Sequence, residues 1–137
     1  MLDREDALHM IGQAYAARAR GDKEALAAYW SEGAHFRIAA NEVTLHNITI
    51  ESDNVMKTIG ELIDRFTFTD LQRLEAVVED HKVAIRWAVN VSFQGQPPVR
   101  TEMMDLIHLD DDGRILSFVQ FADTALIKAM VEGYTET

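Results

Sequence analysis

The chain has 137 residues, the length of one typical domain, and 47% of them are hydrophobic, which excludes an intrinsically disordered chain. Its 23 acidic and 13 basic residues give a net charge of −10. This charge repels phosphate groups, so neither nucleic acid nor an anionic membrane is an expected partner.

The sequence contains no cysteine, which excludes disulfides and thiolate metal ligands. The N-terminal residues are charged and lack the apolar segment of a signal peptide, and no window approaches membrane-spanning length. No linker, internal repeat or low-complexity tract interrupts the chain. We therefore expect a cytoplasmic protein with a single domain over residues 1–137.

Two helices are expected at the beginning of the chain. Residues 4–20 carry apolar side chains at helical spacing, and Gly21 is placed to end this helix. Asp22 can cap a second, shorter helix that extends through Trp30, with Gly33 just past its end. Because the two helices are separated by only two residues, the chain must turn sharply between them.

A strand is expected from Ala34 to Ala40, where apolar and polar residues alternate, and a second short strand over residues 43–50. A third helix, capped by Asp53, has a clear apolar stripe that ends at Phe66. The remaining chain is expected to form four strands joined by tight turns or a short loop, at residues 68–78, 82–93, 99–109 and 115–122. A short helix over residues 124–132 follows them.

This order of elements predicts an α+β fold. Strands joined by tight turns exclude a parallel doubly wound sheet. We expect a cone-shaped molecule in which a strongly curved antiparallel sheet wraps around three N-terminal helices, with a short C-terminal helix. Such a fold leaves a cavity between helices and sheet, and a cavity of this kind is a usual place for a small ligand.

Two parts of the sequence resemble known proteins. The motifs Phe93-Gln-Gly-Gln-Pro, Met104-Asp-Leu and Asp112-Gly-Arg-Ile resemble the C-terminal half of bacterial ketosteroid isomerases. Residues 15–34, with Gly21-Asp and Ala28-Tyr-Trp, resemble the beginning of the nuclear transport factor 2-like superfamily, which also contains SnoaL-type polyketide cyclases. The resemblance covers nearly the whole chain in element order and implies the cone-shaped fold.

The resemblance assigns Asp105 to the position where the isomerases keep an aspartic acid in their oxyanion hole. That acid is a known example of a carboxyl group kept neutral by an apolar site. By strand alternation Asp105 shares its face with Thr101, Met103 and Ile107, so burial should raise its pKa and let it donate a hydrogen bond to a ligand oxygen. The alternative is an ordinary polar residue paired with a neighbour or with water.

The other parts of the isomerase site do not match. The general base of the isomerases falls at Ile38, which cannot accept a proton. Their oxyanion-hole tyrosine aligns nearest Ala14, one residue from Tyr15, and their supporting tyrosines fall at Trp30 and Ile59. The sequence therefore gives no warrant for steroid isomerisation by the known mechanism.

Strand alternation and the resemblance together predict the side chains that line the cavity. We expect these to be Tyr15, Trp30, Ile38, Trp87, Val89, Met103, Phe118 and Gln120. For the aromatic residues, packing in the core is the competing interpretation, in which the polar atoms of Tyr15 and Trp30 bond to the backbone.

No metal or other cofactor is expected, because His9, His35, His46, His81 and His108 are not spaced as metal ligands. In this superfamily the outer face of the sheet commonly mediates dimerisation. The resemblance therefore implies a homodimer through the face that bears Arg86, Asn90 and Ser92, although a solvated face would have the same pattern.

Two functions from different classes follow from these observations. The first is an isomerase- or cyclase-like enzyme that acts on an apolar small molecule, with Asp105 as acid or hydrogen-bond donor. The second is a non-catalytic module that binds an apolar ligand or a protein partner. The apolar surroundings of Asp105 favour the first, and Ile38 in place of a base favours the second.

Overall fold

The computed structural model describes residues 3–41, 45, 49–52 and 54–133. It contains four helices and five strands in these residues. In chain order they are α1 (Arg4–Arg20), α2 (Lys23–Ala27), β1 (Trp30–Ile38), α3 (Val55–Arg65), β2 (Phe66–Glu79), β3 (Lys82–Phe93), β4 (Val99–Leu109), β5 (Ile115–Phe121) and α4 (Thr124–Glu132). The expected strand over residues 43–50 lies largely outside the described residues.

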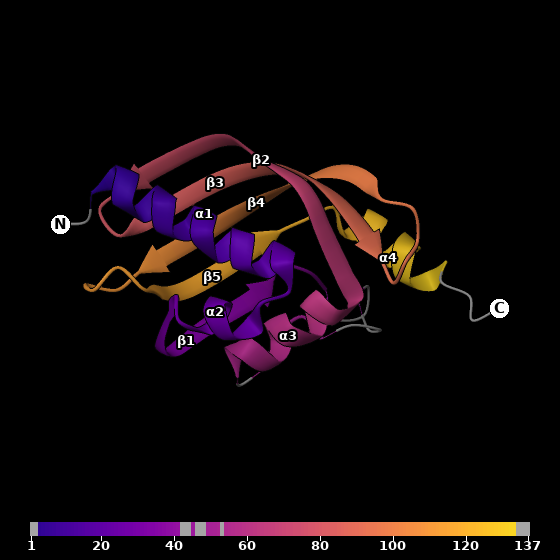
Figure 1. The fold of residues 1–137 in the computed structure, drawn as a ribbon, viewed down its shortest axis with the longest axis horizontal. Helices are drawn as coiled ribbons and strands as arrows, with labels where there is room; N and C mark the ends of the chain where they lie inside the picture. The colour runs from indigo at the N-terminus through magenta and orange to yellow at the C-terminus, as the bar shows by residue number, and fades with distance from the viewer. Residues whose placement is uncertain (1–2, 42–44, 46–48, 53, 134–137) are drawn as a thin grey trace.

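The five strands form one curved, unclosed sheet in the order β1-β5-β4-β3-β2, which confirms the expected fold class. The pairs β2–β3, β3–β4 and β4–β5 are antiparallel, whereas β1 pairs with β5 in parallel, a feature that the sequence did not reveal. The long strand β2 bends along its length (Figure 1), and its register with β3 shifts between Thr69 and Gln72. Such irregularities increase the local twist and bend of a strand.

Capping residues determine where the helices begin and end, and the sequence indicates most of these residues. The Asp3 side chain accepts a hydrogen bond from the Glu5 backbone, and Gly21 ends α1 in the left-handed conformation with φ 73°. Asn54 caps α3 by accepting from two backbone N–H groups, and the expected cap Asp53 lies outside the described residues. Helix α1 lies across one face of the sheet, over β3, β4 and β5 (Figure 1).

The prediction for the second helix was wrong at its C-terminal end. Helix α2 ends at Ala27, and Trp30 is already the first residue of β1. Gly33 lies inside β1 with φ 76°, where the pairing with β5 shifts register between Trp30 and His35. Gly33 therefore permits a bulge in a strand and does not end a helix.

The expected alternation in the sheet is confirmed. The β3 residues at odd positions from Val83 to Phe93 are all buried. On β4, Met103, Asp105 and Ile107 are buried on the same side of the sheet, facing the helices. None of the helices in the described residues is sufficiently long and apolar to cross a membrane.

Candidate functional site

A mostly apolar cavity of about 100 Å³ lies between the helices and the inner face of the sheet. Its wall includes most of the side chains that the sequence assigned to it: Tyr15, Trp30, Ile38, Val89, Met103, Phe118 and Gln120. Asp105 and Trp87, which were also assigned to the site, are not on this wall. They lie directly behind it, in contact with Tyr15.

Asp105 is fully buried and is the centre of a hydrogen-bonded cluster. Its Oδ2 accepts hydrogen bonds from the Tyr15 hydroxyl and, at 3.0 Å, from Nε1 of Trp87. Its Oδ1 accepts from Nε2 of Gln120 at 3.2 Å, and the same Nε2 lies 3.0 Å from the Tyr15 oxygen. The cluster therefore connects a buried carboxyl group to two side chains, those of Tyr15 and Gln120, that face the cavity.

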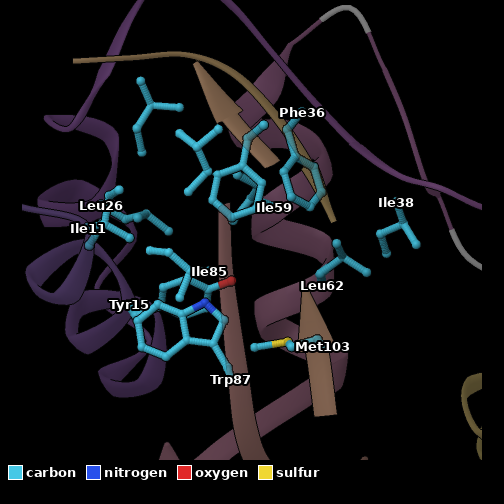
Figure 2. Close-up of a cluster of buried hydrophobic side chains, with 14 of the residues drawn as sticks. Ile11, Tyr15, Leu26, Phe36, Ile38, Ile59, Leu62, Ile85, Trp87 and Met103 are labelled. Atoms are coloured by element: carbon cyan, nitrogen blue, oxygen red, sulfur yellow. The ribbon is translucent and has the colours of Figure 1, made fainter. Parts of the chain in front are cut away.

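Sheet register and helix packing bring these residues together. Asp105 on β4 is the direct partner of Gln120 on β5, and Trp87 lies on the neighbouring strand β3, one diagonal position away. Tyr15 reaches the cluster from α1, and its ring packs against Trp87 with centroids 4.6 Å apart. Figure 2 shows the Tyr15 hydroxyl beside the indole nitrogen of Trp87, with Ile85 and Met103 close by.

The pKa of Asp105 is raised by its burial. Desolvation raises this pKa from 3.8 to about 7, although the hydrogen bonds from Tyr15, Gln120 and Trp87 oppose the shift by stabilising the carboxylate. Burial and the neighbouring Asp105 raise the pKa of Tyr15 well above 10, so the phenol keeps its proton. Near neutral pH, Asp105 thus has both ionisation states available, and Tyr15 remains a hydrogen-bond donor.

The ionisation state of Asp105 determines where the Tyr15 hydrogen points. When Asp105 is ionised, it accepts the hydrogen of Tyr15, which then has no hydrogen left for a ligand. When Asp105 is protonated, its own O–H can donate to the Tyr15 oxygen. That oxygen then accepts from both Asp105 and Gln120, and its hydrogen is free to point into the cavity.

The cavity has a further polar atom that is not satisfied. The indole N–H of Trp30 is buried, and it has no hydrogen-bond partner among the described residues. An unpaired buried donor is costly, by about 1–3 kcal/mol. A ligand acceptor or a bound water would remove this cost.

Ile38 lies on the cavity wall, so the position of the isomerase base is apolar in this protein. Two acidic residues, Glu102 and Asp123, also line the cavity, but both side chains have other partners. Glu102 bonds to Arg86 at 2.7 Å, and Asp123 caps α4 by accepting from the Leu126 backbone at 3.0 Å. The part of the chain that the structure describes contains no group of three His, Cys, Asp or Glu residues that could hold a metal ion.

Sequence reasoning missed one functional candidate, Arg18. It lies three residues after Tyr15 on α1, and it too lines the cavity. Residues three apart share one face of a helix, so this position could have been found once Tyr15 was placed at the cavity.

The fold defines a class of protein in which a curved sheet and N-terminal helices enclose a cavity. Residues 11–118 match the model of the SnoaL-like domain. The chain therefore belongs to the SnoaL-like domain family, within the nuclear transport factor 2-like superfamily. No curated protein sequence matches the chain.

Solved structures with the same fold share little sequence with this chain. A protein from Bacillus subtilis named "Putative Isomerase" has a TM-score of 0.81 and 16% identity, with 100% of each chain covered. A protein of the same name from Rhodopseudomonas palustris has a TM-score of 0.76 and 14% identity, with 98% of this chain and 100% of the other covered. An LEH-like epoxide hydrolase from M. tuberculosis has a TM-score of 0.70 and 14% identity, with 94% and 92% covered.

Proposed function

We propose that this protein binds a small, mostly apolar carbonyl compound and promotes an isomerase- or cyclase-like reaction on it. In this proposal Tyr15 is the catalytic residue that donates a hydrogen bond to the ligand oxygen. Asp105 is a positioning residue that acts through Tyr15. The observation that carries the proposal is the buried cluster in which Asp105 bonds to Tyr15 and Gln120, both on the cavity wall.

The chemistry follows from the direction of the Tyr15 hydrogen. With Asp105 protonated, the Tyr15 hydroxyl is free to donate to a carbonyl oxygen in the cavity. Negative charge develops on that oxygen when a neighbouring C–H bond loses its proton, and a donor held in an apolar site stabilises this charge more strongly than water does. The similarity in fold to the two isomerase-named proteins supports this class of reaction.

A second candidate function is ligand binding without catalysis. Ile38 in place of a base favours it, together with the engagement of Glu102 and Asp123 by other groups. In the enzyme proposal, a water molecule in the cavity or the ligand itself must therefore accept the proton. The Trp30 N–H, which lacks a partner among the residues that the structure describes, is compatible with either function, because both require a ligand with a hydrogen-bond acceptor.

Exchange of α-protons distinguishes the two functions without knowledge of the natural substrate. Cyclohexanone in D₂O is incubated with the protein, and loss of its α-proton NMR signal is compared with loss in buffer alone. An isomerase-like site accelerates the exchange, and Tyr15→Phe removes the acceleration. Cyclohexanone that binds without accelerated exchange would support the non-catalytic function.

A further inference from the structure

The cavity contains a cation that the proposed reaction does not use. Arg18 lies on α1 three residues after Tyr15, and both side chains line the cavity. The side chain of Arg18 is partly buried, and its guanidinium carbon lies 3.8 Å from the centre of the Phe68 ring. Its hydrogen bond within the described part of the chain is a long one, 3.4 Å, from Nη2 to the carbonyl oxygen of Leu62. Leu62 and Phe68 are also cavity residues.

Among the described residues, Arg18 forms no ion pair. Arg86, by contrast, is paired with both Glu75 and Glu102. The two acidic residues of the cavity wall do not neutralise Arg18, because Glu102 bonds to Arg86 and Asp123 caps α4. The positive charge of Arg18 is therefore available to a ligand.

The chemistry of Arg18 favours one kind of ligand group. Its burial lowers the pKa of the guanidinium to about 10, so it still carries its charge at neutral pH. A charge that is partly removed from water is costly unless it is paired. The planar guanidinium has a fork of N–H donors that matches the two oxygens of a carboxylate, and stacking on Phe68 holds its plane in place.

We propose that Arg18 binds a carboxylate of the ligand, so that the substrate class is an oxo acid, with an apolar chain or ring between its ketone and its carboxylate. Arg18 would hold the carboxylate, and Tyr15, one helical turn away, would hold the ketone oxygen. The ketone half of this inference rests on the proposed function. The carboxylate half does not depend on it.

A series of linear methyl-ketone acids, from 4-oxopentanoate to 8-oxononanoate, and their primary amides test the inference. Each amide has nearly the same size and shape as its acid but carries no charge. Dissociation constants are measured at pH 7 by NMR titration. We expect the best acid of the series to bind roughly tenfold or more tightly than its amide, as for a hydrogen bond to a charged group.

Two variants separate Arg18 from the general charge of the protein. Arg18→Met keeps an apolar stem, and it should reduce the acid-to-amide ratio of affinities to about one. Arg20→Met is the matched control, because it removes one positive charge from the same helix at an exposed position. It should leave the ratio unchanged. Arg18→Lys, which keeps the charge and loses the fork, should have an intermediate ratio.

A direct readout does not require a variant. In the wild-type protein, binding of the acid should shift the NMR signal of the Arg18 side-chain N–H, and binding of the amide should shift it much less. A purely structural role for Arg18, as an anchor between α1 and Leu62, would leave acids and amides equally bound. Equal affinities, no binding by any acid, or a preference for acids that persists in Arg18→Met would each overturn the inference.

The outcomes also separate this inference from the proposed function. If acids bind through Arg18 while cyclohexanone shows no accelerated exchange, the result supports the carboxylate site and contradicts the proposed reaction. If exchange is accelerated but acids bind no better than amides, the reaction stands and the substrate class proposed here fails.

Discussion

The hydroxyl of Tyr15 on the first helix donates a hydrogen bond to Oδ2 of Asp105 on the fourth strand, 90 residues later in the chain. This contact joins a group that remains protonated to one whose pKa lies near neutrality. Five predictions rest on this cluster, on the cavity wall beside it and on the sheet that carries it.

The stability of the protein should depend on pH through Asp105. The pKa of Asp105 is raised in the folded state to about 7 from an ordinary value of 3.8, so the unfolded chain releases this proton first. The contribution of Asp105 to the free energy of unfolding is therefore greatest below about pH 4. It falls between pH 4 and pH 7, by roughly 4 kcal/mol in total, and is constant above that range.

Chemical denaturation from pH 4 to pH 8 measures this dependence. Residue 105 cannot titrate in Asp105→Asn. The free energy of unfolding of the wild type should therefore decrease relative to that of this variant as the pH rises. A difference that stays constant over this range would show that the carboxyl group titrates normally in the folded protein.

Asp105→Leu should destabilise the protein at pH 5 despite the apolar neighbours of this position. The apolar face formed with Met103 and Ile107 by itself favours leucine, but leucine leaves the indole N–H of Trp87 buried without its acceptor. The expected cost is about 1–3 kcal/mol in the free energy of unfolding. Equal or higher stability of the leucine variant, measured by denaturation at pH 5, would show that Trp87 finds another acceptor.

Binding of a neutral ketone should weaken as the pH rises above 7. The Tyr15 hydrogen is free for the ligand only while Asp105 is protonated, so the affinity for cyclohexanone should fall by roughly tenfold for each pH unit above 7. NMR titrations at pH 5.5 and 8.5 measure this effect, and Tyr15→Phe should bind weakly with little pH dependence. An affinity in the wild type that rises with pH would mean that the ligand is held by another group.

The protein should not isomerise a β,γ-unsaturated 3-ketosteroid at an enzymatic rate. Ile38 occupies the cavity wall where a base is required, and a positioned base typically contributes 10²–10⁴-fold to the rate. No absorbance change from the conjugated product is expected on mixing. A robust absorbance change would mean that a different residue supplies the base.

We expect a homodimer through the outer face of the sheet, as the superfamily resemblance implies. This face carries Arg86, and beside it on β4 and β5 lie Met104, Leu106 and Phe121, which are 43%, 42% and 49% exposed. Apolar side chains grouped in this way are typical of an interface. Light scattering should give about twice the chain mass of 15.5 kDa.

The variants for this prediction follow from the same face. Leu106→Lys should shift the protein toward the monomer, whereas Val99→Lys, an equally drastic change at an exposed residue of β4 on the opposite face of the sheet, should not. A monomeric wild type at micromolar concentration would contradict the prediction.

Alternation and capping made most of the fold predictable from the sequence. The buried face of β3 and the Gly21 cap of α1 are local patterns, and the structure has both. The end of α2 was missed because Tyr29 and Trp30 continue a helical spacing, whereas pairing with β5 makes Trp30 part of a strand. The parallel pairing of β1 with β5 is a contact between distant segments that no local pattern specifies.

Seven of the eight side chains that we expected to line the cavity lie on its wall, whereas Trp87 and Asp105 lie behind it. Asp105 was expected to reach the cavity itself, and the structure instead places Tyr15 and Gln120 between its carboxyl group and the cavity. The alternation of side chains along a strand predicts on which face of the sheet a side chain lies. It does not predict how deeply that side chain is buried beneath a helix that covers this face. Arg18 was missed because its role depends on which carboxylates are already paired, and this is a property of the folded molecule.

The two tryptophans of this sequence occupy different environments that make them separate optical reporters. The indole N–H of Trp87 is bonded to Asp105, so its fluorescence should follow the ionisation of that carboxyl group. The indole N–H of Trp30 is buried at the cavity wall and has no partner in the described part of the chain, so its emission should change when a ligand oxygen binds there. In Trp30→Phe the remaining fluorescence would report the ionisation of Asp105, and in Trp87→Phe it would report ligand binding. The two events could then be measured independently, without any added dye.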